Sequence, residues 1–303
     1  MTDSAGIIIS AYKNKLAVPA FNIPYLPMVE PVINAVRDQD AFAFIAVARL
    51  EWIKFEAVSA AAVYDEFMRH YDPAHVRLHL DHVPVIDEDG VRVDYMHVLR
   101  EAVGLGYHSV MLDGSRLSFE ENVECTCRAV ETAHAGGAAC EAELGAVMGH
   151  EDGPEVDYES IYSSGKGFTD VDEAASFVEH TGCDWLSVAI GNIHGAIAKA
   201  RKGRKKIAAK LDLDHLSELA RATGIPLVLH GGSSVPVGYV REAVKLGISK
   251  INIATEIRQA YEERMADAGS CPEACRAVYE RTVWILRDYL GVAGTARKLT
   301  GEG

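Results

Sequence analysis

The sequence has few cysteines for its length and no closely spaced pair of the kind that holds a structural zinc ion. The six cysteines stand at positions 125, 127, 140, 183, 271 and 275 without a C-x-x-C motif, which indicates reduced thiols and argues against a disulfide or cysteine–zinc framework. Basic residues are also scarce, because 30 Lys and Arg face 44 Asp and Glu and the net charge is -14. Nucleic-acid binding depends on accumulated Lys and Arg, so we expect no nucleic-acid partner.

Long hydrophobic runs are absent as well. No apolar run approaches the ~18 residues that read as a membrane span, and the first residues, MTDSAGIIIS, lack the basic flank and long apolar segment of a signal peptide. We therefore expect no membrane association and, by default, a cytoplasmic location. No Pro/Gly-rich linker divides the 303 residues, so we expect a single domain over 1–303 with a C-terminal helical extension from about 257 to 303.

What the sequence does contain is an alternation of short β-rich runs with longer amphipathic segments. Helical patterns such as LDHLSELARATG and PVGYVREAVKLG end in Gly, as helix C-termini often do. About eight such β–α units in a row favour an α/β fold, a closed (β/α)8 TIM barrel, over an open doubly wound sheet. The expected strands are 17–23, 41–48, 76–82, 109–113, 138–144, 185–190, 226–230 and 249–253.

Histidines end three of these runs, and a carboxylate closes a fourth. His82 follows RLHLD, His194 follows LSVAIGNI, His230 follows PLVL, and Glu143 lies in ACEAELG. Catalytic side chains of such barrels come from the C-terminal ends of the strands and the loops that follow. One histidine at a strand end is commonly structural, but three of them with a Glu at the same end of one barrel favour a divalent-metal site.

The run RLHLDH also places other polar residues near the barrel mouth. Side chains alternate along a strand, so His79 and Asp81 share one face, whereas His82 lies at the strand's end, where the chain can turn inward. Asp81 and His82 are therefore both candidates for the mouth. His79 is expected to pack or to orient other groups one layer below.

Two segments suggest a phosphate site. HGGSS (230–234) follows the seventh expected strand and NIAT (252–255) the eighth, where barrels often bind phosphate. Gly231 and Gly232 allow backbone N–H groups to approach an oxyanion closely, and Ser233 adds a hydroxyl donor.

Taken together and in order, these motifs resemble the class II, metal-dependent ketose-bisphosphate aldolases, which include fructose- and tagatose-bisphosphate aldolases. The similarity covers roughly the first 290 positions, and this family is a TIM barrel, as the strand spacing predicts. The matching segments are VPAFNI (18–23), HLDH (79–82), SVMLDGS (109–115), EAELG (141–145), HED (150–152), AIGNIHG (189–195), LVLHGGSSVP (227–236) and KINIATEIR (250–258).

The resemblance implies a catalytic zinc ion held by His82, His194 and His230, with Glu143 as a ligand in some metal positions. Such a metal stabilises the enediolate that forms when a phosphorylated ketose is cleaved reversibly to dihydroxyacetone phosphate and an aldehyde. Asp81 matches the acid/base that moves the C4-hydroxyl proton. Glu151 matches the loop carboxylate that moves the C3 proton.

The resemblance also implies the residues that bind substrate and phosphate. Arg258 matches a residue that reaches across a dimer to the second phosphate, so a homodimer or homotetramer is expected. Lys199 matches a family lysine near the first phosphate, but only under one placement of an alignment gap. A monovalent cation near the phosphate is a further expectation. The expected set is Asn22, Gly195, Lys199, Gly231, Ser233, Asn252, Ala254, Thr255 and Arg258.

Several positions depart from the fructose-type pattern. Ala254 stands where fructose-type members usually have Asp and tagatose-type members have Ala, whereas Arg258 looks more like the fructose type. Ala48 replaces a small hydroxyl residue, and Arg49 and Glu51 bring charges to the mouth. The basic loop AKARKGRKK (198–206) is either a solvated loop or a lid that attracts an anion.

Two alternatives from other classes stay open at this stage. A metal-dependent hydrolase on the same barrel would use zinc-bound water as its nucleophile, but the phosphate segments and the lack of a two-metal ligand set count against it. A non-catalytic sugar-phosphate-binding protein would keep the phosphate site without Asp81 and Glu151, and both are present.

Overall fold

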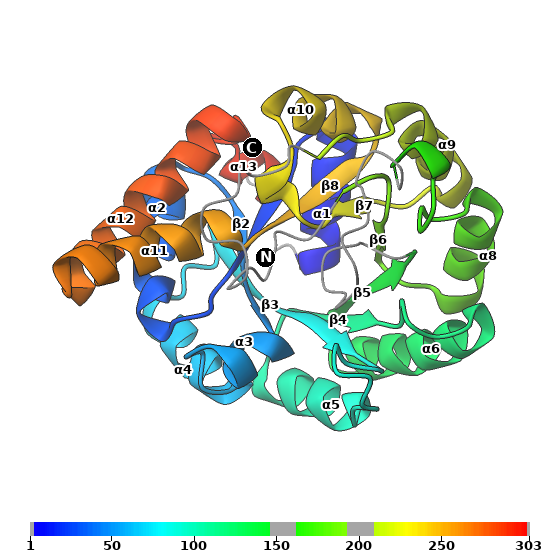
Figure 1. Ribbon diagram of the computed structural model, residues 1–303, viewed down its shortest axis with the longest axis horizontal. Helices are drawn as coiled ribbons and strands as arrows, with labels where there is room; N and C mark the ends of the chain where they lie inside the picture. The colour runs from blue at the N-terminus through cyan, green and yellow to red at the C-terminus, as the bar shows by residue number, and fades with distance from the viewer. Residues whose placement is uncertain (1–2, 146–161, 193–208, 302–303) are drawn as a thin grey trace.

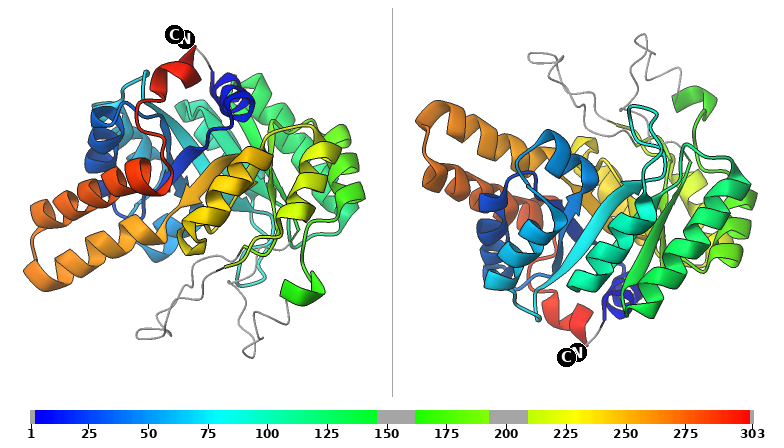
Figure 2. Two further views of the ribbon diagram at one scale, coloured as in Figure 1. Left: turned by 90° about the horizontal axis from the view of Figure 1, so that it is seen from above. Right: turned by 90° about the horizontal axis from the view of Figure 1, so that it is seen from below.

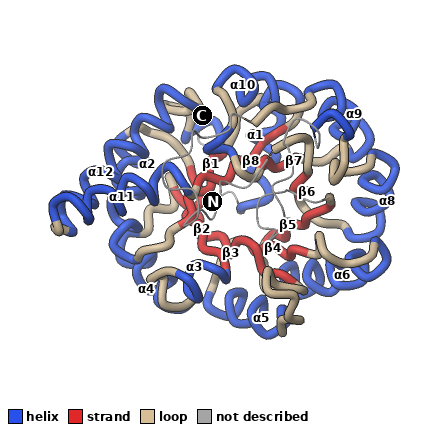
Figure 3. The backbone as a smooth tube through the Cα atoms, in the orientation of Figure 1, coloured by secondary structure: helices blue, strands red, loops and turns tan. Residues whose placement is uncertain are grey.

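A closed barrel of eight parallel strands forms the centre of the protein (Figures 1 and 3). The computed structural model describes residues 3–145, 162–192 and 209–301. The strands follow chain order around the barrel, and β8 pairs with β1 to close it. They are β1 (Val18–Asn22), β2 (Ala43–Ala48), β3 (Val76–Pro84), β4 (Ser109–Asp113), β5 (Ala139–Leu144), β6 (Trp185–Val188), β7 (Leu227–Leu229) and β8 (Ile248–Ile253).

Most of the helices form a ring outside this barrel, as Figure 3 shows. The (β/α)8 barrel predicted from the sequence is therefore confirmed. The α-helices described are α1 (Ser4–Asn14), α2 (Val29–Asp38), α3 (Arg49–Lys54), α4 (Ala60–His70), α5 (Tyr95–Leu105), α6 (Phe119–Ala135), α8 (Val171–Thr181), α9 (Leu213–Thr223), α10 (Val237–Leu246), α11 (Thr255–Ala268), α12 (Cys271–Trp284) and α13 (Ala296–Thr300). Short 3-10 segments are η1 (Leu26–Met28) and η2 (Gly232–Ser234), and η3 (Ile285–Tyr289) is a π-helical turn.

Local sequence signals fix many of the helix ends. Ser118 caps α6 by accepting a hydrogen bond from the backbone N–H of Glu121, and Asp170 and Asp212 cap α8 and α9 in the same way. A side-chain oxygen at this position satisfies one of the N–H groups that a helix leaves unpaired. At the other end of α9, Gly224 adopts a left-handed conformation with φ +65°, as the Gly at the end of its helical pattern predicted.

Two apolar layers hold the barrel together. The larger one lies between the strands and the surrounding helices. The smaller one lies inside the barrel, where Ile7 and Ile8 of α1 join Phe42, Phe44 and Trp185 in one buried cluster. Helix α1 therefore plugs the N-terminal end of the barrel, and the opposite end is left for polar side chains.

The C-terminal helices leave the barrel and return to it. Figure 2 shows α11 and α12 projecting as an antiparallel hairpin, and α13 then lies beside α1 at the base of the barrel, where the Ser10 hydroxyl donates to the Lys298 carbonyl over 2.8 Å. Within the described part of the chain, no helix combines the length and apolar character that a membrane span requires.

Candidate active site

Polar side chains from β3, β5 and β7 meet at the end of the barrel where those strands finish. His82 lies in β3, Glu143 in β5, and His230 directly after β7. Parallel strands place their C-terminal ends at the same rim (Figure 1). Three of the four predicted metal ligands therefore lie together.

The backbone of β3 is irregular where Asp81 and His82 lie. Its pairing with β4 shifts register between Leu80 and Val83, and His82 has a positive φ of +34°. Such a bulge breaks the alternation of side chains, so Asp81 and His82, although adjacent, both reach the barrel mouth. The strand continues to Pro84, so His82 turns inward through this irregularity and not because the strand ends.

The three ligand atoms form a compact triangle. His82 Nε2 lies 3.0 Å from His230 Nδ1, and Glu143 Oε2 lies 3.7 Å from the first and 3.6 Å from the second. Ligands about 2.1 Å from a tetrahedral metal ion are about 3.4 Å apart. The donor set and its spacing therefore fit a divalent metal ion, and we call these three residues the metal cluster.

Electrostatics at the metal cluster favour a cation. Burial and the nearby charge of Asp113 together raise the pKa of Glu143 to about 8. Burial by itself lowers the pKa of His82, but the negative charge and hydrogen bond of Asp81 outweigh it and raise this pKa to about 10. Surplus negative charge therefore draws a positive charge to this point, and a metal ion can take the place of the proton.

His230 is held from behind by a second carboxylate that sequence reasoning did not single out. Its Nε2 lies 2.9 Å from Glu141 Oε1, and both side chains are fully buried. Burial alone raises the pKa of Glu141, but the charge of Lys250 and the His230 hydrogen bond outweigh it and lower this pKa to about 2. Metal-binding histidines typically donate their second ring N–H to such a carboxylate, so His230 Nδ1 is the nitrogen available to a metal.

Asp81 is clamped by two amide side chains. Asn22 Nδ2 donates to Asp81 Oδ2 over 2.8 Å, and Asn252 Nδ2 donates to Asp81 Oδ1 over 2.9 Å. Burial opposes ionisation of Asp81, but the charge of His82 and its hydrogen bond of 3.0 Å outweigh burial and hold the pKa of Asp81 well below its usual range. Asn22, Asn252 and Asp81 therefore form one fixed unit beside the metal cluster.

The segment after β7 is a tight loop packed closely against β8. Gly231 is left-handed with φ +69°, and a Cβ on Gly232 would lie 2.5 Å from Ile251 Cγ2 of β8. The Tyr289 hydroxyl, from η3, lies 2.7 Å from the carbonyl oxygens of Gly232 and Val235. Tyr289 therefore anchors this loop to the C-terminal helices, a role that no local sequence pattern signals.

The remaining predicted phosphate residues border this loop. Ser233 lies in η2, Asn252 near the end of β8, Ala254 directly after β8, and Thr255 in the first turn of α11. The structure thus brings both predicted phosphate segments to neighbouring strand ends.

Arg258 makes its contacts within its own chain. Its Nη1 lies 3.0 and 2.7 Å from the two carboxylate oxygens of Glu262, and its guanidinium group lies over the ring of Phe55. The Tyr25 hydroxyl donates to the same Glu262 over 2.8 Å. Reaching another subunit's phosphate would require Arg258 to exchange these contacts, and that role stays a prediction.

The segment after β2 uses its charges structurally. Glu51 is buried and accepts a hydrogen bond of 2.7 Å from the backbone N–H of Ala48. Burial raises the pKa of Glu51 to about 8, although the bond from Ala48 opposes this. Arg49 Nη1 lies 3.5 Å from Asp87 Oδ2.

Four predicted site residues lie outside the described residues. They are Glu151, His194, Gly195 and Lys199, together with the basic loop 198–206. Their predicted roles rest on the sequence alone.

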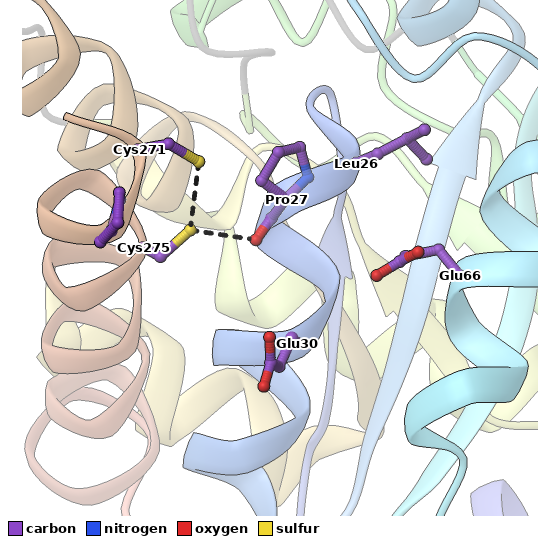
Figure 4. A pocket seen from close by; sticks show the side chains of 7 residues that line it. Leu26, Pro27, Glu30, Glu66, Cys271 and Cys275 are labelled. Atoms are coloured by element: carbon purple, nitrogen blue, oxygen red, sulfur yellow. Dashed lines mark hydrogen bonds between the residues drawn. The ribbon is translucent and has the colours of Figure 1, made fainter. Parts of the chain in front are cut away.

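A surface pocket of about 480 Å³ lies beside α12 (Figure 4). In it the thiols of Cys271 and Cys275 are 3.9 Å apart, and Cys275 Sγ lies 3.2 Å from the Pro27 carbonyl oxygen. None of the predicted site residues lines it. The full lining is Leu26, Pro27, Glu30, Glu66, Cys271, Pro272 and Cys275.

Histidine and carboxylate groups that can hold a metal ion converge at the C-terminal rim of this (β/α)8 barrel, which is where barrel enzymes carry their active sites. A family model described as fructose-bisphosphate aldolase class-II matches residues 2–295. The chain therefore belongs to the class II fructose-bisphosphate aldolase family, and it is an aldolase, a carbon–carbon lyase.

Solved structures agree with this assignment. The YdjI aldolase from Escherichia coli K12 is 28% identical with a TM-score of 0.76, over 98% of this chain and 99% of that one. A Coccidioides immitis protein provisionally described as a fructose-1,6-bisphosphate aldolase is 25% identical with a TM-score of 0.76, over 97% of each chain. The fructose-bisphosphate aldolase of Campylobacter jejuni, 19% identical with a TM-score of 0.71 over 95% of this chain and 94% of that one, shares the fold.

Proposed function

We propose that this protein is a zinc-dependent aldolase that reversibly cleaves a phosphorylated ketose to dihydroxyacetone phosphate and an aldehyde. The observation that carries this proposal is the metal cluster beside the clamped carboxylate of Asp81: His82 and Glu143 offer ligand atoms at metal-site spacing, and Asp81 accepts from Asn22 and Asn252. A metal-dependent aldol cleavage uses a Lewis acid together with a nearby proton acceptor.

In this proposal His82, His194 and His230 hold the zinc ion, and Glu143 is a ligand in some metal positions. The bound ion would supply Lewis-acid polarisation of the ketone. Asp81 takes the C4-hydroxyl proton, so that the C4–oxygen bond becomes a carbonyl as the C3–C4 bond breaks and its electron pair passes to the ketose fragment. Glu151 then delivers a proton to C3, and condensation runs the same steps in reverse.

The phosphate end of the substrate is assigned to the loop after β7 and the start of α11. Gly231, Ser233, Asn252 and Thr255 border this space, and the N-terminus of a helix favours an anion. Gly195 and Lys199 complete the proposed site, with a monovalent cation near the phosphate.

The aldehyde portion is where this chain differs from the fructose type. Ala254 offers no carboxylate to accept a hydrogen bond from a substrate hydroxyl, and tagatose-type members also have Ala at this position. This residue therefore favours a tagatose-type configuration, because the loss of one polar contact can strongly change which hydroxyl stereochemistry the site prefers. Arg258 is proposed to bind a second phosphate in a homodimer or homotetramer.

The first test is a coupled assay for dihydroxyacetone phosphate released from tagatose bisphosphate, fructose bisphosphate and related phosphorylated ketoses, with and without a chelator. We expect chelator-sensitive release that zinc restores. Release that persists in metal-free protein would contradict the proposed chemistry.

Asp81→Asn separates the aldolase from a protein that only binds sugar phosphates. The amide keeps the size of the carboxylate beside Asn252 but cannot act as the base, so cleavage should fall by about 10²- to 10⁴-fold while zinc content stays near one per chain. Cleavage close to the wild-type rate would show that Asp81 is not the acid/base.

A further inference from the structure

Beneath the metal cluster lies a fully buried lysine. Lys250 is in β8 and its side chain is 0% exposed. Its Nζ lies 2.7 Å from Glu141 Oε2 and donates to Asn252 Oδ1 over 2.6 Å. This one ammonium group therefore contacts the carboxylate behind a metal ligand and the amide that clamps Asp81.

Two hydrogen-bonded arms start from Lys250. One ends at the metal ligand His230, and the other ends at the carboxylate of Asp81. The metal arm runs from Lys250 to Glu141 and on to His230 Nε2, 2.9 Å away. The carboxylate arm runs from Lys250 to Asn252, whose Nδ2 donates to Asp81 over 2.9 Å.

The hydrogen-bonding capacity of each group gives the metal arm one direction. A lysine ammonium group can only donate, and so can the indole N–H of Trp185, which also donates to Glu141 Oε2. Both of these donors reach Glu141 Oε2, and the adjacent ammonium group favours the ionised form of the carboxyl group. Oε1 then accepts as well, so His230 Nε2 carries the proton that it donates to Glu141. The lone pair of His230 is thereby fixed on Nδ1, the atom that faces His82 and Glu143.

The carboxylate arm is directed in the same way. An Asn side chain can present either its oxygen or its NH₂ group to a given neighbour. Because Lys250 only donates, it selects the orientation in which Asn252 Oδ1 faces it, and the NH₂ group of Asn252 then points at Asp81. Asp81 is thus held as an acceptor.

Stability alone gives a weak reason for this arrangement. A buried Lys–Glu pair loses hydration at both ends, and well-packed apolar residues of similar volume are often as stable or more so. What apolar residues cannot supply is a source of donated hydrogen bonds with a fixed direction.

We infer that Lys250 is a positioning residue that sets the metal-binding face of His230 and the orientation of the Asp81 carboxylate at the same time. This inference rests on the proposed function for the role of Asp81, whereas the metal arm can be tested without any cleavage assay.

The experiment compares Lys250→Met with the wild type in two measurements: zinc affinity by competition with a chromophoric chelator, and cleavage at saturating zinc. Loss of a group that supports a metal ligand should weaken zinc binding by about 10- to 100-fold. Cleavage should also remain reduced when zinc is saturating, because the carboxylate arm is lost as well. Glu141→Gln changes a residue of the metal arm and none of the carboxylate arm. It should weaken zinc binding, and at saturating zinc it should recover a larger fraction of wild-type cleavage than Lys250→Met does.

Arg77→Met is the matched control. Arg77 is another buried cation of the barrel strands, and its Nη1 donates to the Pro73 and Val76 carbonyls before the polar part of β3. It should lower stability without changing zinc affinity. Equal losses of zinc affinity in Arg77→Met and Lys250→Met would overturn the inference, and so would wild-type zinc affinity and turnover in Lys250→Met.

Lys250→Met leaves the Glu141 carboxylate without its cation and could fail to fold. The double variant Lys250→Met/Glu141→Gln removes both buried charges, and its zinc affinity should be no lower than that of the weaker single variant, since both changes break one arm. Wild-type zinc affinity in the double variant would refute the metal arm. If the wild type binds zinc but cleaves no ketose, the proposed function fails while the zinc comparison still decides the metal arm.

Discussion

His108 offers a quantitative test of the packing around the barrel, because this partly buried side chain is held in its neutral form. Its Nδ1 accepts a hydrogen bond of 3.0 Å from the backbone N–H of Leu78, and its ring lies beside those of Phe67 and Tyr71. Burial, with the positive charge of Arg77, lowers the pKa of His108 from 6.5 to about 4. A protonated Nδ1 could not accept the Leu78 bond.

The sign of the effect follows from proton binding. Between pH 6.5 and 4 the unfolded chain binds a proton at His108 and the folded protein does not, so stability falls as the pH drops through this window. With these two pKa values the contribution between pH 7 and pH 5 is about 2 kcal/mol, and the full shift corresponds to about 3 kcal/mol.

The measurement is urea unfolding at pH 7 and pH 5 for the wild type and for His108→Asn. Asn offers an oxygen acceptor close to the position of Nδ1 but does not titrate. Carboxylates titrate in both proteins, so the variant isolates His108: its loss of stability on acidification should be about 2 kcal/mol smaller than that of the wild type. Equal losses in the two proteins would refute the neutral state of His108 in the folded protein.

Two further predictions concern the loop after β7. Tyr289→Phe removes the hydroxyl that contacts this loop, so KM for a phosphorylated ketose should rise and stability should fall by about 1–2 kcal/mol. Tyr107→Phe removes a comparable buried hydrogen bond elsewhere and should leave KM unchanged. An equal rise of KM in both variants would contradict the anchoring role of Tyr289. Gly232→Ala places a Cβ 2.5 Å from Ile251 Cγ2, so it should lower the free energy of unfolding in urea by about 1–3 kcal/mol and raise KM. The control Gly238→Ala, whose Cβ meets nothing within 4 Å, should do neither. A wild-type KM in Gly232→Ala would show that the loop tolerates displacement.

The fold was accessible from the sequence because the periodic signals are local. Each of the eight predicted strands is present, with ends within two residues of the prediction. Caps such as Ser118 and C-terminal glycines such as Gly224 mark helix ends without any knowledge of the tertiary structure. The closed barrel then follows from repeated β–α units.

The site was only partly accessible, because its geometry depends on features that do not repeat. Strand ends pointed to His82, Glu143 and His230, and these residues do converge. The positive φ of His82 and the register shift in β3 have no sequence signature of their own. Tyr289 reaches the loop after β7 from more than fifty residues away, and only folding brings the two together.

The buried charged residues beneath the metal cluster could also have been predicted from the sequence, by a different criterion. Strands of a parallel barrel are covered on both faces, one by helices and one by the barrel interior, so a charged residue inside such a strand has no route to water. It must be paired, because an isolated buried charge is very costly. Beyond the predicted ligands and Asp81, the buried charged residues within predicted strands include Arg77, Glu141 and Lys250. Arg77 donates to backbone carbonyls, whereas Glu141 and Lys250 pair with each other at 2.7 Å with both side chains fully buried. In a barrel of this kind, an oppositely charged pair within the strands therefore indicates the support of the site, as the strand ends indicate its ligands.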